Sequence, residues 1–535
     1  MCIITFMLAK LGCNWVKLAI VVRGPRTTIA NLIQLRSDKG RPGKYRPGFI
    51  LVAIYFKLSK QIKLNEPPLA YYRFPIIGHT WSYFTDCEKL ILESREKYGE
   101  TFSLYVFGQV ITIAGNKTTQ KIFKKDKEFS FFKASEERMQ LDRIFIGQNF
   151  DTNTRLIRTC FQEKLDHFRS RLQKNIIMAI DLYIGECVEP RIIRAPYETM
   201  FDIMAIPVAN LLIDDEYCNN EDMLEAVKSV ANSMFKLLFV PPILSFIHPW
   251  LHKQFISIPL RLGWSPISKP SKVILSRIKP VIEKRLYDKK RLGDAWVAPL
   301  DILQYLLDDP DITPDLNPDN VNYNRIVSTI TGIIFASMPN MSNNTSRALF
   351  DLVERNQRYW HKLCQEAQEI NKKSNGNELT SDDLHKMMKL DSFIRESLRI
   401  SGSFIVGVEH NCISKSYYTF INGYQVPNGR KVYLNFTETN HNEGLQGQNP
   451  TEFYAYRHLE RNSSATKLES NFLTFGGGKH ACPGRFLAVN VMKIVLHNIM
   501  LRYNIRTETG VIDPKRRYFG PVPMQIKDLT IFSQG

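Results

Sequence analysis

The sequence predicts a mainly α-helical protein with a small β-rich N-terminal subdomain. Long helical patterns dominate from residue 155 to about residue 303, and another runs from Val321 to Arg355. The stretch 101–114 (TFSLYVFGQVITIA) instead favours two β-rich runs that meet at Gly108-Gln109. With 535 residues, 44% of them hydrophobic, the chain can build one large compact enzyme or two packed domains.

The other predicted elements follow from local pattern and from turn residues. We expect breaks in the helical region at Pro241-Pro242, Pro249 and Pro259, because proline lacks a backbone N–H. The further predictions are a helix over 88–98, a helix over 486–503 and a terminal β hairpin. Residues 406–412 and 418–433 are expected to form strands joined by turns at Asn422-Gly423 and Pro427-Asn428-Gly429.

The net charge of +18 is concentrated at the N-terminal end. Residues 1–66 contain twelve Lys or Arg and two acidic residues, so they carry ten of the eighteen excess charges. No nucleic-acid-binding module accompanies them, and basic residues beside apolar runs are typical of the cytoplasmic face of a membrane. Residues 1–22 are mostly apolar and just long enough to span a bilayer, although Lys10 and Lys17 fall inside. We therefore predict a basic membrane-anchor and linker region over 1–66, ahead of a folded domain over 67–535.

One of the nine cysteines stands apart from the others, whose irregular spacing suits a reducing compartment. Cys482 follows a glycine run and directly precedes Pro483-Gly484 and an apolar helical segment. Its sulfur should therefore lie near a helix N-terminus, which is expected to lower the pKa of the thiol. The glycines let the backbone pass close to a flat group, and His480 can donate to an anion at the edge of that group. The alternative is a small buried structural cysteine.

The segment Phe475–Arg485 (FGGGKHACPGR) resembles the haem-binding loop of the cytochrome P450 superfamily, of the microsomal or fungal kind. That loop has a phenylalanine, spaced glycines (here Gly476 and Gly478), a basic residue two positions before the cysteine and a glycine (here Gly484) two positions after it. The resemblance covers the chain from about Pro67 to the C-terminus, and it implies the cytochrome P450 fold with haem b as cofactor.

The resemblance also implies roles for individual residues. Cys482 would be the iron ligand, Phe475 would pack beside the sulfur, and His480 would contact a haem propionate. His410 falls where the family often has a propionate-binding arginine.

A second motif is a pair of opposite charges that precedes the cysteine loop. Glu396 and Arg399 are three residues apart, which places both on one face of a helix. They match the family's Glu-x-x-Arg pair, and Arg457 matches the arginine that completes a triad, although Ala455 replaces the proline expected there. A buried carboxylate with two guanidiniums is costly unless every partner is present, so we expect this triad to fix the loop that carries Cys482.

The predicted helix over Val321–Arg355 matches the helix that crosses the distal face of the haem in the family. The usual acid falls on Pro339 and the usual threonine on Asn340, so both groups that relay protons in the family are absent. Asn340 can orient water, but an amide neither gains nor loses a proton near neutral pH. Pro339 is expected to kink the helix, and a merely irregular helix is an equal alternative.

The resemblance implies a haem-thiolate monooxygenase that inserts one oxygen atom from dioxygen into a sterol, a terpenoid or a fatty-acid-like substrate. Its expected partners are NADPH-cytochrome P450 reductase and a membrane, without nucleic acid, and its expected location is the endoplasmic reticulum membrane with the catalytic domain facing the cytosol. Because the distal motif is altered, two alternatives remain open: a dioxygen-independent isomerase or dehydratase of oxygenated lipids, and a haem-binding paralogue without enzymatic activity.

Overall fold

A computed structural model describes residues 64–534, apart from 147–149, 214–219, 239, 355–357, 377, 508–517 and 525–529. The chain divides into two units, Met1–Lys63 and Leu64–Gly535, and the described residues belong to the second. The predicted membrane segment over 1–22 lies outside the described residues. Within the described ranges, no helix combines the length and the apolar character that crossing a bilayer requires.

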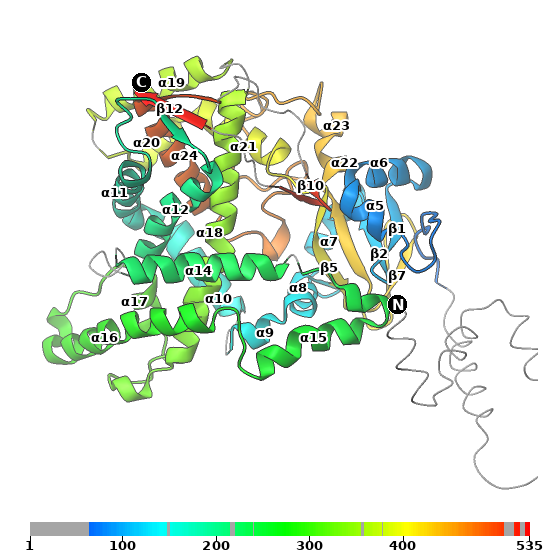
Figure 1. The fold of residues 1–535 in the computed structure, drawn as a ribbon, viewed down its shortest axis with the longest axis horizontal. Helices are drawn as coiled ribbons and strands as arrows, with labels where there is room; N and C mark the ends of the chain where they lie inside the picture. Colours follow the sequence, from blue (N-terminus) through cyan, green and yellow to red (C-terminus); the bar gives the residue numbers. More distant parts are fainter. Residues whose placement is uncertain are drawn as a thin grey trace, which may run out of the picture. The chain divides into compact units, whose positions relative to one another are not determined.

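Helices form the larger part of this unit, as the sequence predicted (Figure 1). Apolar residues at helical spacing build one large core, and the longest helix, α18, crosses it in contact with α12, α14, α16, α21 and α24. The principal helices are α10 (Phe150–Arg158), α11 (Leu165–Tyr183), α12 (Pro196–Leu212), α14 (Glu221–Leu238), α16 (Ser268–Leu292), α18 (Tyr323–Glu354), α19 (Trp360–Lys373), α21 (Met388–Ile400) and α24 (Arg485–Arg502).

The main sheet joins the N-terminal hairpin to strands from the last third of the chain. Its strand order is β1-β2-β8-β5-β3, from β1 (Thr101–Val106), β2 (Gln109–Ala114), β8 (Lys431–Asn435), β5 (Val406–Cys412) and β3 (Phe129–Ser130). The β1–β2 hairpin turns at the predicted position, and β2 pairs in parallel with β8 from Ile111↔Lys431 onward. The sheet thus pairs strands that lie far apart in the sequence, and local sequence patterns do not reveal such a pairing.

Shorter elements connect these layers. The remaining helical segments are α5 (Thr80–Thr85), α6 (Cys87–Tyr98), α7 (Asn116–Lys124), α8 (Phe131–Met139), α9 (Leu141–Ile144), η1 (Thr159–Glu163), η2 (Ile243–Phe246), α15 (Pro249–Arg261), η3 (Gly293–Ala295), α17 (Ile302–Leu307), η4 (Pro318–Asn320), α20 (Ser381–Lys386), α22 (Phe436–Asn440), α23 (Glu443–Gln446) and η5 (Gly478–His480). The remaining strands are β4 (Arg191–Ile193), β6 (Tyr417–Thr419), β7 (Gln425–Pro427), β9 (Tyr503–Thr507), β10 (Tyr518–Phe519), β11 (Val522–Pro523) and β12 (Thr530–Gln534).

One predicted helix break is wrong. Pro259 lies inside α15, which continues to Arg261. A proline there leaves the carbonyl of Phe255 without its helical partner, but Phe255 is exposed and water can take that place. Pro249, in contrast, opens the same helix at a position that suits proline.

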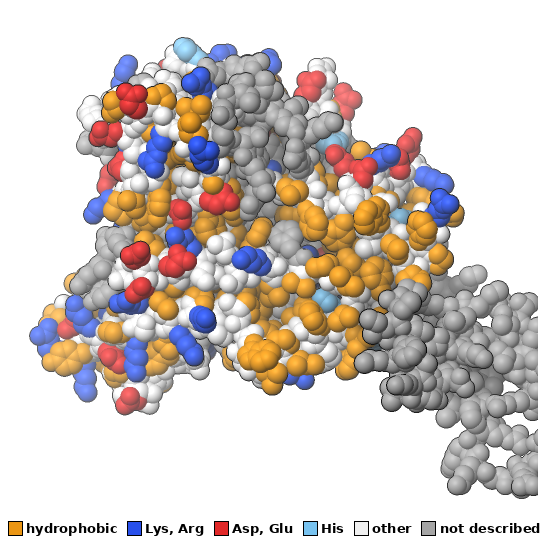
Figure 2. Space-filling view, in the orientation of Figure 1, with side chains coloured by type: hydrophobic (Ala, Val, Ile, Leu, Met, Phe, Trp, Pro, Cys, Tyr) orange, Lys and Arg blue, Asp and Glu red, His pale blue; other side chains and the backbone are white. Residues whose placement is uncertain are grey.

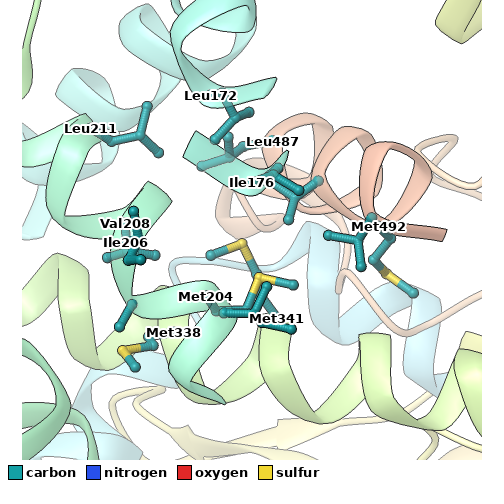
Figure 3. Close-up of a cluster of buried hydrophobic side chains, with 14 of the residues drawn as sticks. Leu172, Ile176, Met204, Ile206, Val208, Leu211, Met338, Met341, Leu487 and Met492 are labelled. Carbon is teal, nitrogen blue, oxygen red and sulfur yellow. The ribbon is translucent and has the colours of Figure 1, made fainter. Parts of the chain in front are cut away.

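The distal helix α18 and the helix after the cysteine loop, α24, share one apolar cluster (Figure 3). Met338 and Met341 of α18 lie beside Met204 of α12, while α24 contributes Leu487 and Met492. The core therefore holds both helices in fixed positions relative to each other.

Candidate functional site

Cys482 lies in a closed loop between η5 and α24. Its backbone N–H donates to the carbonyl of Phe475 over 2.8 Å, and Gly476 N–H donates to the carbonyl of Leu473 over 2.8 Å. Gly484 directly precedes Arg485, the first residue of α24, so the half-buried Cys482 lies three positions before that helix begins. The placement of the cysteine at a helix N-terminus is as the sequence predicted.

The glycines of this loop let its backbone come close to a neighbouring group, and that group is Phe123 of the protein itself. Gly476 and Gly478 have positive φ of 69° and 64°, which side chains rarely tolerate. A Cβ on Gly477 would come within 2.8 Å of the Phe123 ring, and one on Gly478 within 2.1 Å of the Phe123 carbonyl oxygen. Phe123 of α7, which sequence reasoning did not single out, therefore supports the loop from one side.

The predicted lowering of the thiol pKa is wrong in its net direction. Burial raises the pKa of Cys482 above its ordinary value, and this effect exceeds the opposing influence of the Gly484 and Arg485 N–H groups and of the Arg485 guanidinium. The helix end acts as expected, but placing a thiolate in a poorly solvated loop costs more. A metal cation at the sulfur reverses this balance, because a coordinating thiol is deprotonated.

Two histidines, His480 and His410, lie near each other beside a group of phenylalanines. The ring of His480 packs edge-on against Phe132 at 5.2 Å, and His410 contacts Phe123 and Phe131 at 5.9 Å. Burial lowers the pKa of His410 to about 4, and repulsion from a charged His480 acts in the same direction.

His410 is aimed by an irregular strand. β5 shifts its pairing with β8 between Gly407 and His410, and Val408 there has a positive φ of 48°. A β-branched residue in this conformation is strained, so the surrounding sheet must hold it in place. His410 Nδ1 and the carbonyl of Val408 are 2.7 Å apart, which fixes the imidazole orientation.

The predicted ion triad is present and fully buried. Arg399 of α21 binds Glu396 through two hydrogen bonds of 2.8 Å, from Nε to Oε2 and from Nη2 to Oε1. Arg457 donates from Nε to Oε1 of the same carboxylate over 3.0 Å, as does the backbone N–H of Tyr454. Burial alone would raise the pKa of Glu396, but these donors and His458 hold it well below its usual range.

A fourth member of this cluster, His458, was missed from the sequence. His458 Nε2 lies 3.0 Å from Glu396 Oε2, and the side chain is buried. Burial lowers the pKa of His458, although the Glu396 carboxylate opposes the shift. The only signal in the sequence is its position directly after Arg457, since nothing local shows that its ring turns inward.

The two arginines fix the chain that leads toward the cysteine loop. Arg399 Nη1 donates to the carbonyls of Asn440 (2.6 Å) and Pro450 (2.7 Å). Arg457 donates to four further carbonyls, those of Gln446, Gln448, Asn449 and Glu452, over 2.8–3.1 Å. A single buried carboxylate thereby orients two guanidiniums that satisfy the carbonyls of an irregular segment.

Arg395, also missed from the sequence, continues this support. Its Nη1 donates to the carbonyl of Ser464 over 2.6 Å, and its guanidinium lies 4.2 Å from the centre of the Phe472 ring. Phe472 packs edge-on against Phe475, whose carbonyl accepts the N–H of Cys482. A continuous series of contacts thus connects α21 to the cysteine itself.

The distal helix carries the other predicted residues, Pro339 and Asn340. α18 remains helical through the buried Pro339. Asn340 Nδ2 donates a hydrogen bond to the carbonyl of Ala336 over 2.9 Å. Ala336 and Asn340 are exposed although they occupy the middle of a 32-residue helix. Among the described residues, no hydrogen bond joins Asn340 to Cys482.

The residues around Cys482 fit a haem by the chemistry of their donors. Cys482 offers a soft sulfur ligand of the kind that haem iron accepts, and His480 offers a ring N–H to a carboxylate. The neutral His410 ring donates its one N–H, on Nδ1, to the Val408 carbonyl, so it can donate to a carboxylate only when its Nε2 is also protonated. Neither of two surface clefts, of about 370 Å³ beside Trp296 and about 330 Å³ beside Glu438, contains any of these residues.

Known proteins are similar to this chain over most of its length. A family model described as Cytochrome P450 matches residues 67–527. Cytochrome P450 monooxygenase 110 of Postia placenta is 26% identical over 492 residues, which cover 87% of this chain and 92% of the relative. Cytochrome P450 monooxygenase olcJ of Penicillium canescens is 23% identical over 520 residues, with 92% and 94% covered. Cytochrome P450 monooxygenase ataF of Aspergillus terreus is 32% identical over 195 residues, 35% of this chain and 39% of the relative.

Proposed function

The chain belongs to the cytochrome P450 family and is an enzyme of the monooxygenase class, and on that premise we propose that it inserts one oxygen atom from dioxygen into an apolar lipid, either a sterol, a terpenoid or a fatty-acid-like molecule. Haem b is the proposed cofactor, with electrons from NADPH supplied by NADPH-cytochrome P450 reductase. The observation that carries this proposal is the series of contacts from Arg395, the neighbour of Glu396 on α21, through Phe472 and Phe475 to Cys482.

Each residue of the site has a proposed task. Cys482 would ligate the iron, and His480 would donate a ring N–H to a haem propionate. His410 would join it as an imidazolium, because the negative charge of a nearby propionate favours protonation of its Nε2. Because burial raises the pKa of Cys482, the free thiol keeps its proton. It would give up that proton on binding iron, since a metal is bound by the thiolate. When bound, the haem would supply the redox-active iron at which dioxygen is activated.

The distal residues have a smaller proposed role. Asn340 holds its amide against the carbonyl of Ala336, so it can accept a hydrogen bond from water or substrate but cannot exchange a proton. Pro339 removes one backbone N–H, which leaves the carbonyl of Phe335 without its usual helical partner. Proton delivery in this enzyme would therefore come from water or from the substrate.

A second candidate function is favoured by the residues at the two distal positions. Asn340 and Pro339 stand where the family has its alcohol and its acid, and a reaction that rearranges an already oxygenated lipid requires neither dioxygen nor a proton relay. This alternative is an isomerase or a dehydratase. It would use the same thiolate-bound haem.

We also propose that the enzyme works at the endoplasmic reticulum membrane, with residues 1–66 as anchor and linker and residues 67–535 as the catalytic domain facing the cytosol. Large apolar side chains are exposed on and beside α5 and α15, including Trp81, Trp250 and Trp264 (57–74% exposed). Figure 2 shows orange hydrophobic side chains gathered over α15 and toward α5. Phe107, packed against both Phe84 of α5 and Phe246 of η2, joins the two areas into one surface suited to lipid.

Turnover on a panel of sterols, terpenoids and fatty acids tests the proposal. The full chain, reconstituted with reductase and NADPH, is expected to oxidise at least one substrate only when dioxygen is present. The Cys482→Ser variant serves as the control that should be inactive. Equal conversion without dioxygen and reductase would support the isomerase or dehydratase and contradict the monooxygenase reaction.

A further inference from the structure

We infer that the distal face of α18 selects a lipid that carries a hydroxyl group, and that the carboxamide oxygen of Asn340 accepts the hydrogen bond from that hydroxyl. The inference rests on the proposed function, because it names the class of substrate that the same site would take. It depends on the orientation of one side chain in the described part of the helix.

The exposed strip on α18 lies opposite the apolar face that packs into the core. Met338 and Met341 are buried against α12, whereas Ala336 and Asn340 are exposed. At about 100° per residue, Ala336 and Asn340 are each about 160° around the helix from Met338. Asn340 is therefore presented away from the packed core, at the level where the family's distal helix faces its substrate.

The amide of Asn340 has a defined orientation. Its Nδ2 donates over 2.9 Å to the carbonyl of Ala336, one turn earlier on the same helix. Because a carbonyl can only accept, the amide nitrogen must occupy this position and the oxygen Oδ1 must point outward. Within the described residues, no side chain or backbone group donates a hydrogen bond to that oxygen, so the strip presents an acceptor.

The next turn of the helix repeats the arrangement. Asn344 Nδ2 donates over 2.9 Å to the backbone carbonyl of Asn340, and Asn344 Oδ1 lies beside Gly402. A Cβ on Gly402 would come within 2.5 Å of that oxygen, so the glycine makes room for the amide. Two carboxamides one turn apart therefore turn their nitrogens back to the helix and leave their oxygens as acceptors.

A neutral acceptor discriminates between ligands by whether they bring a hydrogen-bond donor to it. A hydroxyl satisfies Asn340 Oδ1, while a hydrocarbon or an ether removes water from that oxygen and offers nothing in return. Neither Asn340 nor Asn344 carries a charge, so this pair of amides gives no preference for a cationic group. The structure thus favours an alcohol over the matching ether.

Binding titrations can test this inference without turnover. We would titrate the ferric, haem-loaded full chain with three matched pairs, dodecanol, farnesol and cholesterol and their methyl ethers, and follow the change in the Soret band. At least one alcohol should bind about three- to tenfold more tightly than its ether, as expected for one hydrogen bond. Asn340→Leu should abolish that preference while leaving the affinity for the ether nearly unchanged.

Ser337→Ala is the matched control. Ser337 lies one turn from Asn340 but donates its hydroxyl to the carbonyl of Ile333, so its removal should leave the preference intact. Equal affinity for alcohol and ether in all three pairs, or an equal loss of preference in Ser337→Ala, would overturn the inference. These titrations need neither reductase nor dioxygen, so a failure of the proposed oxygenation would be seen separately in the turnover assay.

Discussion

The two sides of the site differ in how their polar groups are satisfied. On the cysteine side, one carboxylate, Glu396, receives hydrogen bonds from Arg399, Arg457, His458 and the Tyr454 backbone, and the arginines bind the carbonyls of the loops that come after. On the distal side, Asn340 bonds only to its own helix among the described residues. The first arrangement holds the segments that lead to the Cys482 loop, whereas the second leaves the Asn340 amide oxygen without a donor among the described residues.

The two sides would serve two tasks of the enzyme, which are retention of the haem and selection of the substrate. The contacts on the cysteine side fit what any haem-thiolate enzyme needs, namely a sulfur held at a constant position. The distal residues Pro339 and Asn340 are the positions that we propose to affect proton delivery and substrate binding. Substitutions on the cysteine side should therefore affect haem retention, while substitutions on the distal side should affect selectivity and coupling.

The largest effect is expected from Glu396→Ala. Removing this carboxylate leaves buried guanidiniums without a counter-charge, which costs about 3–5 kcal/mol, so we expect loss of haem incorporation. Haem content per purified chain measures it. Glu366→Ala is the control, because Glu366 is a buried carboxylate that accepts the N–H groups of Lys389 and Leu390 at the start of the same helix and touches no member of the cluster. A Glu396→Ala protein with normal haem content would contradict the account.

Acid should break the same cluster in the unmodified enzyme. The pKa of Glu396 in the folded chain is well below its value of about 4.3 in an unfolded chain. The stabilisation is therefore fully present above pH of about 4.3 and is lost as the pH falls toward the folded pKa. Absorbance of the haem during acid titration should show release beginning below pH of about 4. A haem spectrum unchanged well below that pH would show that Glu396 does not control retention.

A smaller effect is expected when His458 is removed. His458→Phe deletes one hydrogen bond to a buried charge, which is worth about 1.5–3 kcal/mol, while a ring still fills the space. The pKa of Glu396 should rise, so haem release should move to higher pH than in the unmodified enzyme. His458→Gln, which can still donate, should recover part of the difference. No change in either variant would mean that Arg399 and Arg457 suffice.

The smallest effect on stability, with a selective effect on chemistry, is expected on the distal side. Asn340→Thr restores the alcohol that the family usually has, and it should lower the peroxide released per NADPH consumed without changing haem content. Ser342→Ala on the buried face of the same helix, where the hydroxyl bonds the Met338 carbonyl, should not alter peroxide release. Identical peroxide release in Asn340→Thr and the unmodified enzyme would remove the missing alcohol from the explanation.

The β1–β2 hairpin and much of the cysteine side could be predicted from sequence, because the patterns that indicate them are local. The turn at Gly108-Gln109, the glycines before Cys482 and the Glu396–Arg399 spacing each depend on neighbouring residues.

The parts that could not be predicted depend on contacts between distant segments. Phe123 lies more than 350 positions before the loop it supports, and His458 shows its role only once its ring is placed against α21. The direction predicted for the pKa shift of Cys482 is wrong because burial decides that direction, and no local sequence pattern reveals burial. The orientation of the Asn340 amide likewise becomes visible only in the helix.

The most direct test of the account is the difference spectrum of the reduced enzyme with carbon monoxide. We predict the red-shifted Soret band of a thiolate-bound haem for the unmodified chain and for Asn340→Leu, and its loss in Cys482→Ser. A folded, haem-loaded enzyme that lacks this band, or a Cys482→Ser variant that keeps it, would contradict the assignment of Cys482 as the ligand that the buried cluster holds in place.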